Sequence, residues 1–483
     1  MIKRIMGTIL LAVICFGPLQ AHSGKPKYHV VIDTDGALDD MRSISMLLSQ
    51  NDIRVLALTC SQGTLLPDSV YVKVKSLLSA FHHEGIPVGI GEKSNLELPE
   101  WSAFAQNITW ADAADNPQPD FSENATGLLD RTTENYPHPI TLIALGSLKT
   151  YADWISANPD LSEKIERIIW YNHHDIAKGY NDSASRESYE YIRQTGIQLD
   201  VVSNDSDRLV VNEDYLAGIR GVKSVYARQI GMVHTQPGVE ERITRNHLQL
   251  WDDLVPVYLT VPILFETETI EKINYVSINK SIPDTYVYEA ISQLLESANV
   301  ANNRVFVNFP VDPALYKPEY AKMITSTIEN FGPIEWKAIS MTNEIHGHTG
   351  IYSIIGAKMG IRAMEYFNVG VNNLVVITFA GSEPPLSCFN DGVQISSGAT
   401  IGQGLITVSD SISPVPSALF EFNNQKVTIS LNPEIARQMG DDIRYGIEEY
   451  GLLTDAYWLF IEKLAIEYWR DFDRHEIFTV KRL

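Results

Sequence analysis

The chain has 483 residues, of which 45% are hydrophobic and 20% are charged, and these proportions exclude a wholly disordered chain and a fibrous protein. Its length predicts two or three domains. The 38 basic and 60 acidic residues give a formal net charge of −22. This charge argues against nucleic acid as the main partner, because the protein and the phosphate backbone repel each other.

Residues 1–21 have the pattern of an export signal. Lys3 and Arg4 precede an apolar run at 9–16, and the small residue Ala21 ends the segment. The run is shorter than the ~20 residues of a membrane-spanning helix. We therefore predict a cleaved signal, a periplasmic or secreted protein, and no membrane association after cleavage. A membrane anchor or a lipoprotein is the alternative.

Short apolar runs alternate with segments of helical spacing between residues 28 and 203. The helical spacing is clearest in the apolar residues from Val70 to Phe81. This alternation predicts an α/β fold with a mainly parallel sheet. The predicted strands are 28–33, 53–60, 141–145, 168–171 and 199–202.

The segment 97–137 differs from its surroundings, because it is rich in Asn, Asp, Pro and Ser and shows little periodicity. This composition predicts a long loop or insertion over one face of the sheet. Long loops in such places often carry function, and a solvated loop is the alternative.

Four aspartates, Asp33, Asp35, Asp39 and Asp40, follow one another within eight residues at the end of the first predicted strand. Ligands bind at this end of the strands in a parallel sheet. Apolar residues at helical spacing follow from Met41, so one aspartate could cap a helix. Four grouped carboxylates repel one another unless a cation neutralises them. Their hard oxygen atoms suit Ca²⁺ or Mg²⁺.

The run 31–40 resembles the opening motif of the inosine-uridine nucleoside hydrolase family, Asp-x-Asp-Pro-Gly-x-Asp-Asp. The resemblance continues at 53–63, 86–91, 144–148 and 179–181, and it covers about residues 28–265. It implies a Ca²⁺-dependent hydrolase that cleaves the N-glycosidic bond of a small-molecule ribonucleoside or related riboside.

The resemblance also implies roles for individual residues. Asp39 would be the general base, and Asn181 matches the asparagine that hydrogen-bonds the sugar. The implied cation site consists of Asp33, which would organise the cluster, Asp35, Asp40, the backbone carbonyl of Leu145, and Asp252.

Several positions depart from the family pattern where the substrate would be contacted. Thr64 stands in place of an asparagine, and Gly179 stands in place of a glutamate that holds the ribose. Trp251 replaces the histidine implicated in protonating the leaving base; it is a candidate for stacking on a nucleobase, with ordinary packing as the alternative. His173 and His174 are candidates for the missing acid, and a pair satisfied within its own loop is the alternative.

A second group of metal-ligand residue types lies in the later part of the chain. His346, His348, Cys388 and Asp391 follow the order of a motif in the E-type family of formylmethanofuran dehydrogenase proteins, which the segment 337–430 resembles. Imidazole and thiolate groups suit Zn²⁺. These residues are therefore a candidate Zn²⁺ site, and a turn with locally hydrogen-bonded imidazoles is an equal alternative.

The remaining elements complete an α+β module. We predict a helix at 350–367, a strand at 374–379, a hairpin around Asn423-Asn424, and a long helical region at 433–469. Tyrosines and tryptophans in the last region are interpreted as core packing, with a homo-oligomer interface as the alternative.

We therefore predict three parts: the signal at 1–21, an α/β domain of nucleoside-hydrolase type with a mainly parallel sheet at 22–330, and a smaller α+β domain at 331–483, which resembles the formylmethanofuran dehydrogenase family and ends in C-terminal helices. Two rival functions stay open. One is a non-catalytic protein that uses a bound metal to hold a sugar or nucleoside, and the other places the metal chemistry in the C-terminal module.

Overall fold

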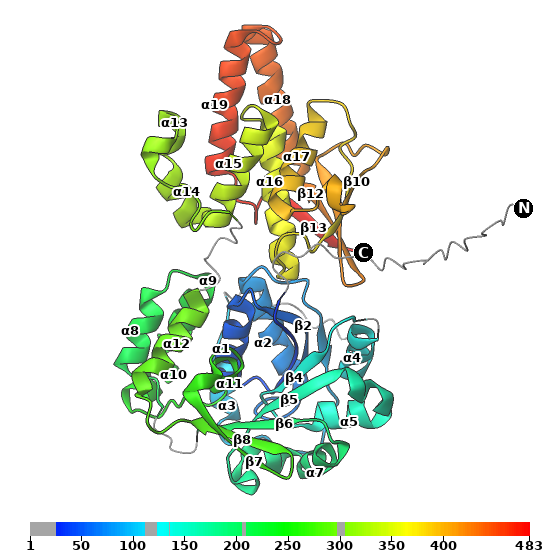
Figure 1. Cartoon of the computed structure of the whole chain (residues 1–483). Helices are drawn as coiled ribbons and strands as arrows, with labels where there is room; N and C mark the ends of the chain where they lie inside the picture. The colour runs from blue at the N-terminus through cyan, green and yellow to red at the C-terminus, as the bar shows by residue number, and fades with distance from the viewer. Residues whose placement is uncertain (1–25, 112–122, 135, 205–208, 297–304) are drawn as a thin grey trace, which may run out of the picture.

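The computed structural model describes residues 26–111, 123–134, 136–204, 209–296 and 305–483, and these form two domains that follow each other along the chain (Figure 1). The predicted class is confirmed: an α/β domain with a large, mainly parallel sheet precedes a smaller domain with its own sheet. The predicted signal at 1–21 lies outside the described residues.

The first domain is built on an eight-stranded sheet in the order β3-β2-β1-β4-β5-β6-β8-β7. Among these described strands, only the pairing of β7 with β8 is antiparallel. All five strands predicted from the apolar runs are present. The strands are β1 (Tyr28–Thr34), β2 (Ile53–Cys60), β3 (Val88–Ile90), β4 (Ile140–Ala144), β5 (Ile165–Tyr171), β6 (Leu199–Ser203), β7 (Phe265–Ile270) and β8 (Ile273–Ile278).

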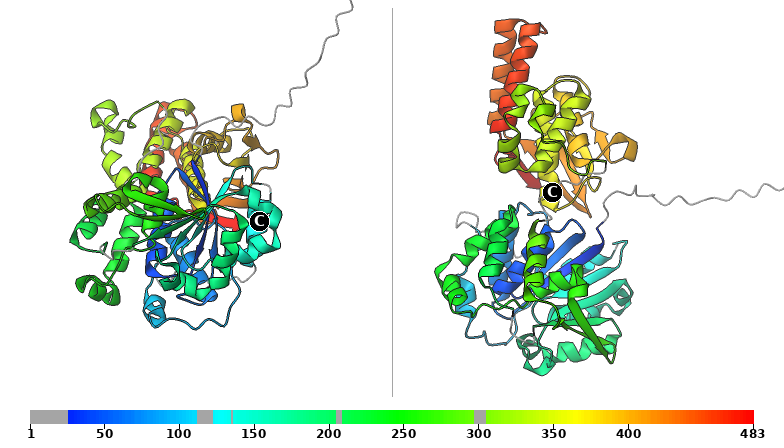
Figure 2. Two further views of the ribbon diagram at one scale, coloured as in Figure 1. Left: turned by 60° about the horizontal axis from the view of Figure 1, so that its bottom comes forward. Right: turned by 60° about the vertical axis from the view of Figure 1, so that its left-hand side comes forward.

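Helices cover both faces of this sheet (Figure 2). In β1, Val30 and Ile32 belong to one apolar core, while Val31 between them belongs to another, as the two-residue period of a strand requires. Burial on both faces explains why the strands read as continuous apolar runs. The helices are α1 (Leu38–Ser49), α2 (Pro67–Ala80), α3 (Ser102–Asn107), α4 (Ala125–Thr133), α5 (Lys149–Ala157), α6 (Tyr180–Ala184), α7 (Arg186–Thr195), α8 (Glu213–Gly221), α9 (Val225–His234), α10 (Pro237–Thr244), α11 (Leu254–Thr260) and α12 (Asp284–Glu296).

The segment 97–137, predicted as a loop, contains the two short helices α3 and α4. In α4, Leu128 and Leu129 are fully buried against the sheet. Their helical pattern is too short to stand out in a polar segment, because only one side of α4 is buried. Residues 112–122 of this segment lie outside the described residues.

The second domain has a five-stranded sheet in the order β10-β9-β11-β12-β13. The central helix α16 is almost entirely buried and packs on α17. The helices are α13 (Pro318–Ala321), α14 (Ile324–Phe331), α15 (Pro333–His346), α16 (Ile351–Phe367), α17 (Phe389–Ser397), α18 (Pro433–Tyr450) and α19 (Asp455–Asp471). The strands are β9 (Val375–Thr378), β10 (Ile406–Val408), β11 (Ser417–Phe422), β12 (Gln425–Leu431) and β13 (Phe478–Arg482).

Two predictions for this domain need correction. The long helical region at 433–469 is two helices, α18 and α19, because the chain turns at Gly451 with a φ of +79°. Met323 and Ile324 already pack in the core of the second domain, so the change of domain falls before the predicted boundary at 330. The predicted hairpin is confirmed, and Asn423 and Asn424 both have positive φ angles, of 47° and 63°.

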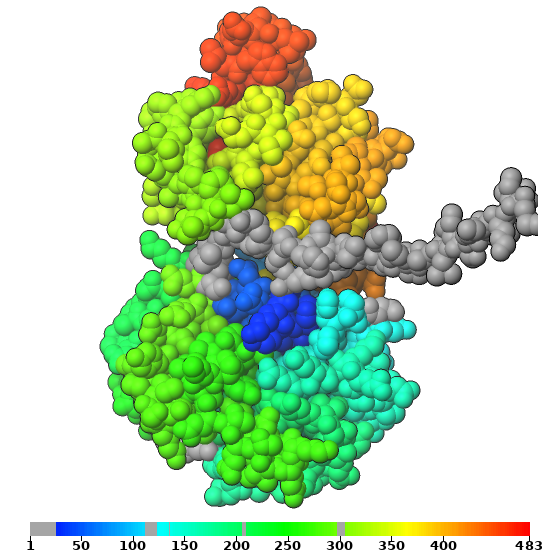
Figure 3. Space-filling model, in the orientation of Figure 1, coloured from blue at the N-terminus to red at the C-terminus, as the bar shows by residue number. Residues whose placement is uncertain are grey.

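The second domain packs on the edge of the first sheet where the strands begin. The backbone N–H of Gly85 donates to the carbonyl of Tyr366 (2.8 Å), and Arg362 Nη1 donates to the carbonyl of His82 (3.2 Å). The segment 82–85 precedes β3, so α16 contacts the edge opposite to the carboxyl ends of the strands. The two domains form separate lobes in the space-filling view (Figure 3). Among the described residues, no helix has both the length and the hydropathy needed to cross a bilayer.

Candidate acidic active site

The acidic residues of the first domain lie where β1 ends. β1 pairs with β2 on one side and β4 on the other, and both pairings are parallel. The strand order reverses direction between β1 and β4, which is the topological switch point where parallel sheets of this kind open a crevice for ligands.

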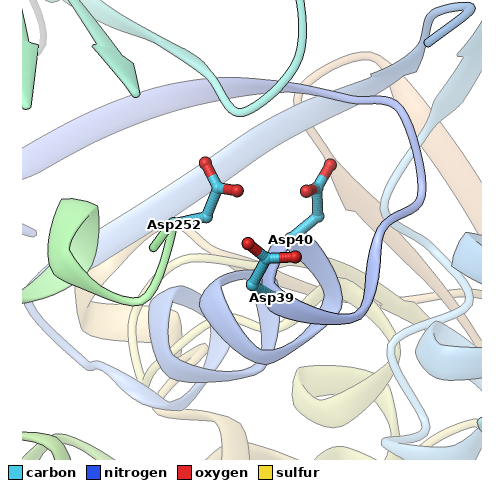
Figure 4. Close-up of side chains that lie close together, drawn as sticks. All are labelled: Asp39, Asp40 and Asp252. Atoms are coloured by element: carbon cyan, nitrogen blue, oxygen red, sulfur yellow. The ribbon is translucent and has the colours of Figure 1, made fainter. Parts of the chain in front are cut away.

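Three carboxylates gather at this point. Asp39 and Asp40 lie in the first turn of α1, and Asp252 lies in the loop before α11 (Figure 4). Each offers a ligand atom, and these atoms lie within 4.8 Å of one another. Within the described part of the chain, no other group of three or more His, Cys, Asp or Glu side chains meets this condition. We call these three residues the acidic cluster.

The turn between β1 and α1 places Asp40. Its Oδ2 accepts hydrogen bonds from the Thr34 hydroxyl (2.7 Å) and from the backbone N–H of Asp35 (3.0 Å). The N-cap residue of α1 is Ala37, and no side chain caps the helix. Capping, the structural alternative for these aspartates, is therefore not what holds them here.

Asp33 lies beneath the acidic cluster and has a different environment from the one predicted. Its two carboxylate oxygens accept hydrogen bonds from the hydroxyls of Thr59 and Ser61, each at 2.6 Å. Asp33 is not part of the acidic cluster. Its oxygens are committed to β2 and the residue after it, so the position suits the predicted organising role better than a role as a cation ligand.

Burial raises the pKa of these carboxyl groups. It raises the pKa of Asp33 to about 7 and that of Asp35 to about 6. The pKa of Asp40 and that of Asp252 are also raised, first by burial and then by the neighbouring negative charges. The free protein lowers this repulsion by taking up protons, and a bound cation would have the same effect.

The unpaired atoms of the site fit a divalent cation. Asp35 Oδ1 and Asp252 Oδ1 are buried and have no hydrogen-bond partner. A buried oxygen without a partner is costly, and a hard cation satisfies carboxylate oxygens well. The donors are all oxygen atoms, which favours Ca²⁺ or Mg²⁺ over softer metals.

The acidic cluster lies in a cavity of about 450 Å³, which other predicted site residues also line. Trp251 is 43% exposed at its wall. Asn181 Nδ2 donates to the backbone carbonyls of Leu145 (2.8 Å) and Tyr171 (3.0 Å). Both amide hydrogens of Asn181 are therefore spent on the backbone, so its Oδ1 is the atom left to accept a hydrogen bond from a sugar hydroxyl.

Several lining residues were not identified from the sequence as site residues. The indole N–H of Trp101 donates to the Thr64 hydroxyl (3.3 Å), and Arg242 lies over the ring of Phe104 at 3.9 Å. Both aromatic residues come from the segment 97–137, for which a functional loop was predicted. His247 also lines the cavity, and no motif marks it in the sequence.

The two histidines proposed as acids have different positions. His173 lines the cavity, and its Nδ1 accepts the backbone N–H of Asp175 (2.9 Å). The hydrogen of the neutral ring is therefore on Nε2. His174 packs edge to face on Tyr275 at 5.3 Å and does not line the cavity.

In the second domain, the predicted zinc ligands do not form one compact group. His346 Nδ1 lies 2.7 Å from Asp391 Oδ2, and the His346 and His348 rings lie 4.4 Å apart. The donor atoms of these residues and Cys388 do not all fall within 4.8 Å of one another. Cys388 and Cys60 are free thiols in different domains.

Two family models match the chain at the places where its motifs predicted a resemblance. Residues 30–171 match the model described as inosine-uridine preferring nucleoside hydrolase. Residues 345–448 match the model described as FmdE, molybdenum formylmethanofuran dehydrogenase operon. The first domain is thus nucleoside-hydrolase-like from β1 to the end of β5, and the second is FmdE-like from the end of α15 through most of α18.

Curated relatives match part of the first domain. The pyrimidine-specific ribonucleoside hydrolase RihA of Salmonella arizonae is 29% identical over 184 residues, which are 35% of this chain and 58% of the relative. RihA of Shewanella baltica is 29% identical over 147 residues, which are 29% of this chain and 46% of the relative. The chain thus spans about half the length of these relatives.

Solved structures also align with the chain. A plant nucleoside hydrolase, PpNRh1, aligns with a TM-score of 0.45 and 19% identity, covering 56% of this chain and 99% of the other. The inosine-uridine preferring nucleoside hydrolase of Bacillus anthracis aligns with a TM-score of 0.47 and 14% identity, with the same coverage of 56% and 99%.

Proposed function

We propose that the first domain is a Ca²⁺-dependent hydrolase of the N-glycosidic bond of ribonucleosides or related ribosides. The observation that carries the proposal is the convergence of Asp39, Asp40 and Asp252 in a cavity at the switch point of the sheet. The family match over residues 30–171 supports the same class of reaction. We also propose export of the chain, on the pattern of residues 1–21.

The acidic cavity suits the charge that develops in this reaction. Cleavage of an N-glycosidic bond passes through a state in which the sugar carries positive charge, and nearby carboxylates stabilise that charge. Ca²⁺ held by Asp40, Asp252 and the unpaired Asp35 Oδ1 would orient sugar hydroxyls and lower the pKa of a water molecule.

In the proposed reaction, Asp39 accepts a proton from water as the water oxygen bonds to C1′ of the ribosyl group. The C1′–N bond breaks, its electron pair passes to the base, and the base then takes up a proton. Asp35 is a second candidate for the proton acceptor, because burial raises its pKa to about 6, near the working pH of a general base.

The aromatic residues of the cavity rim are positioned to hold the base. Trp251 and Trp101 are 43% and 42% exposed, so each keeps ring surface that a planar base could cover. His173, with its hydrogen on Nε2, can donate a hydrogen bond to the leaving base. His247 is an alternative donor on the same wall.

The test is the release of free ribose from a panel of purine and pyrimidine nucleosides. We expect turnover by the mature protein with Ca²⁺ and loss of turnover on chelation of the cation. Asp39→Asn should lower kcat by roughly a hundredfold or more while Ca²⁺ still binds. If Asp35→Asn abolishes turnover and Asp39→Asn does not, Asp35 is the base.

The matched control is Asp153→Asn, which neutralises an exposed aspartate on α5 that pairs with Lys149. It should leave both turnover and Ca²⁺ binding unchanged. Binding of Ca²⁺ without turnover on any nucleoside would contradict the hydrolase and support the non-catalytic binding protein. Calorimetric titration of Ca²⁺ into Asp252→Asn should show the loss of cation binding.

A further inference from the structure

The second domain contains a cavity of about 770 Å³ that lies outside the predicted zinc ligands except for His348. Side chains of α13, α15 and α19 line it (Figure 1). It belongs to a different domain from the acidic cluster. Its volume is in the range of cavities that bind small organic molecules.

Aromatic rings form a continuous wall of this cavity. The indoles of Trp336 and Trp469 stack with centroids 5.0 Å apart and planes at 21°. Tyr316 packs on Trp336 at 5.1 Å, and Tyr320 packs on Trp469 at 6.3 Å. Trp458, also a lining residue, is 42% exposed. Such surfaces favour a flat ligand that stacks.

Unpaired polar atoms in the lining residues indicate that the ligand also forms hydrogen bonds. Asn343 Nδ2 and Oδ1 are both buried without a partner, and so is the indole Nε1 of Trp469. Leaving buried polar atoms unpaired costs free energy. The Asn343 amide presents a donor beside an acceptor, which complements a ring edge with an N–H next to a carbonyl.

The charges around the cavity disfavour an anion. Glu344, Asp455 and Glu462 line it together with one basic residue, Lys317. Lys317 Nζ lies 3.7 Å from Glu462 Oε1, so its charge is partly compensated. The net negative lining repels phosphate and carboxylate groups.

We propose that this cavity binds an uncharged, planar heteroaromatic ring with an N–H beside a carbonyl, the chemistry of a free nucleobase. The ring stacks on the aromatic wall, and its edge pairs with the amide of Asn343. The inference does not depend on hydrolysis in the first domain, because it rests on residues of the second domain alone.

The test is a calorimetric titration of the full chain with free bases. Uracil and hypoxanthine should bind. Binding should be at least about tenfold weaker for 1,3-dimethyluracil, whose ring nitrogens carry no hydrogen, and for orotate, which is the same ring with a carboxylate. Equal binding of uracil and orotate would contradict the charge argument, and failure of uracil and hypoxanthine to bind at millimolar concentration would overturn the proposal.

Variants assign the binding to this cavity. Asn343→Leu and Trp458→Ala should each weaken uracil binding about tenfold or more, and thermal unfolding checks that both variants fold. Trp251→Ala, which alters only the first cavity, should leave this binding unchanged. If Trp251→Ala abolishes binding and the two second-domain variants retain it, bases bind in the first domain and the proposal is wrong.

Discussion

Arg42 and Asp253 form a bidentate ion pair with no exposed side-chain surface. Arg42 Nε lies 2.7 Å from Asp253 Oδ1, and Nη2 lies 2.6 Å from Oδ2, across 211 residues of sequence. Arg42 belongs to α1, which carries Asp39 and Asp40, and Asp253 directly follows Asp252. The pair therefore joins the two chain segments that form the acidic cluster.

Removal of one partner of this pair should destabilise the fold and weaken the cation site together. Arg42→Leu leaves the Asp253 carboxylate buried without its counter-ion, which we expect to lower the free energy of unfolding by about 3–5 kcal/mol. Urea unfolding measures the stability, and titration of Ca²⁺ measures the site.

The double variant Arg42→Leu/Asp253→Leu should regain much of the lost stability, because no uncompensated charge stays buried. Arg186→Leu is the matched control, since Arg186 pairs with Asp182 at the surface and is 55% exposed; its loss should cost less than about 1 kcal/mol. Equal effects of Arg42→Leu and Arg186→Leu would contradict the positioning role.

Gly179 and Asn172 compete for the same space. A Cβ on Gly179 would lie 1.8 Å from Asn172 Oδ1. Gly179→Ala should therefore lower the free energy of unfolding by about 1–3 kcal/mol through overpacking. In an Asn172→Ala background, Gly179→Ala should cost much less, because the clash is gone. Chemical denaturation of the four proteins measures this coupling.

Gly231→Ala in α9 is the control for this series, because nothing lies within 4 Å of its added Cβ. It should not lower stability. The glutamate of the family pattern does not fit at position 179 while Asn172 keeps its place, so a sugar contact at this position would need another residue.

His83 predicts a loss of stability in acid. Its Nδ1 donates to the carbonyl of Glu365 in the second domain (2.7 Å), and its Nε2 accepts from the Tyr226 hydroxyl (2.6 Å). Burial lowers the pKa of His83 to about 4. The unfolded chain then binds more protons than the folded one between about pH 6.5 and pH 4, so stability is full above pH 6.5 and falls as the pH is lowered.

We expect this group to contribute roughly 3 kcal/mol of loss by pH 4. Unfolding measured from pH 8 to pH 4 gives the slope, and His83→Gln should reduce it. His174→Gln, which alters an exposed histidine, should leave the slope as it is. An unchanged slope in His83→Gln would contradict the assignment.

Local sequence pattern was sufficient for most elements of the fold. The buried strands β1, β2, β4, β5 and β6 read as apolar runs because helices cover both faces of the sheet. The helices α3 and α4 did not read as helices, since each buries too few side chains for a clear period. The turn between α18 and α19 was missed because a single residue, Gly451, reverses the chain.

For the site, the sequence by itself determined which chain segments carry the chemistry. Four aspartates in eight residues after a strand indicate a cation site, because like charges at that density need neutralisation. Only the tertiary structure decided how each carboxylate is used. Asp33 is paired with Thr59 and Ser61, while Asp252 is brought to Asp39 and Asp40 from a distant segment. Contacts between residues far apart in sequence depend on how the elements pack, and no local pattern records that packing.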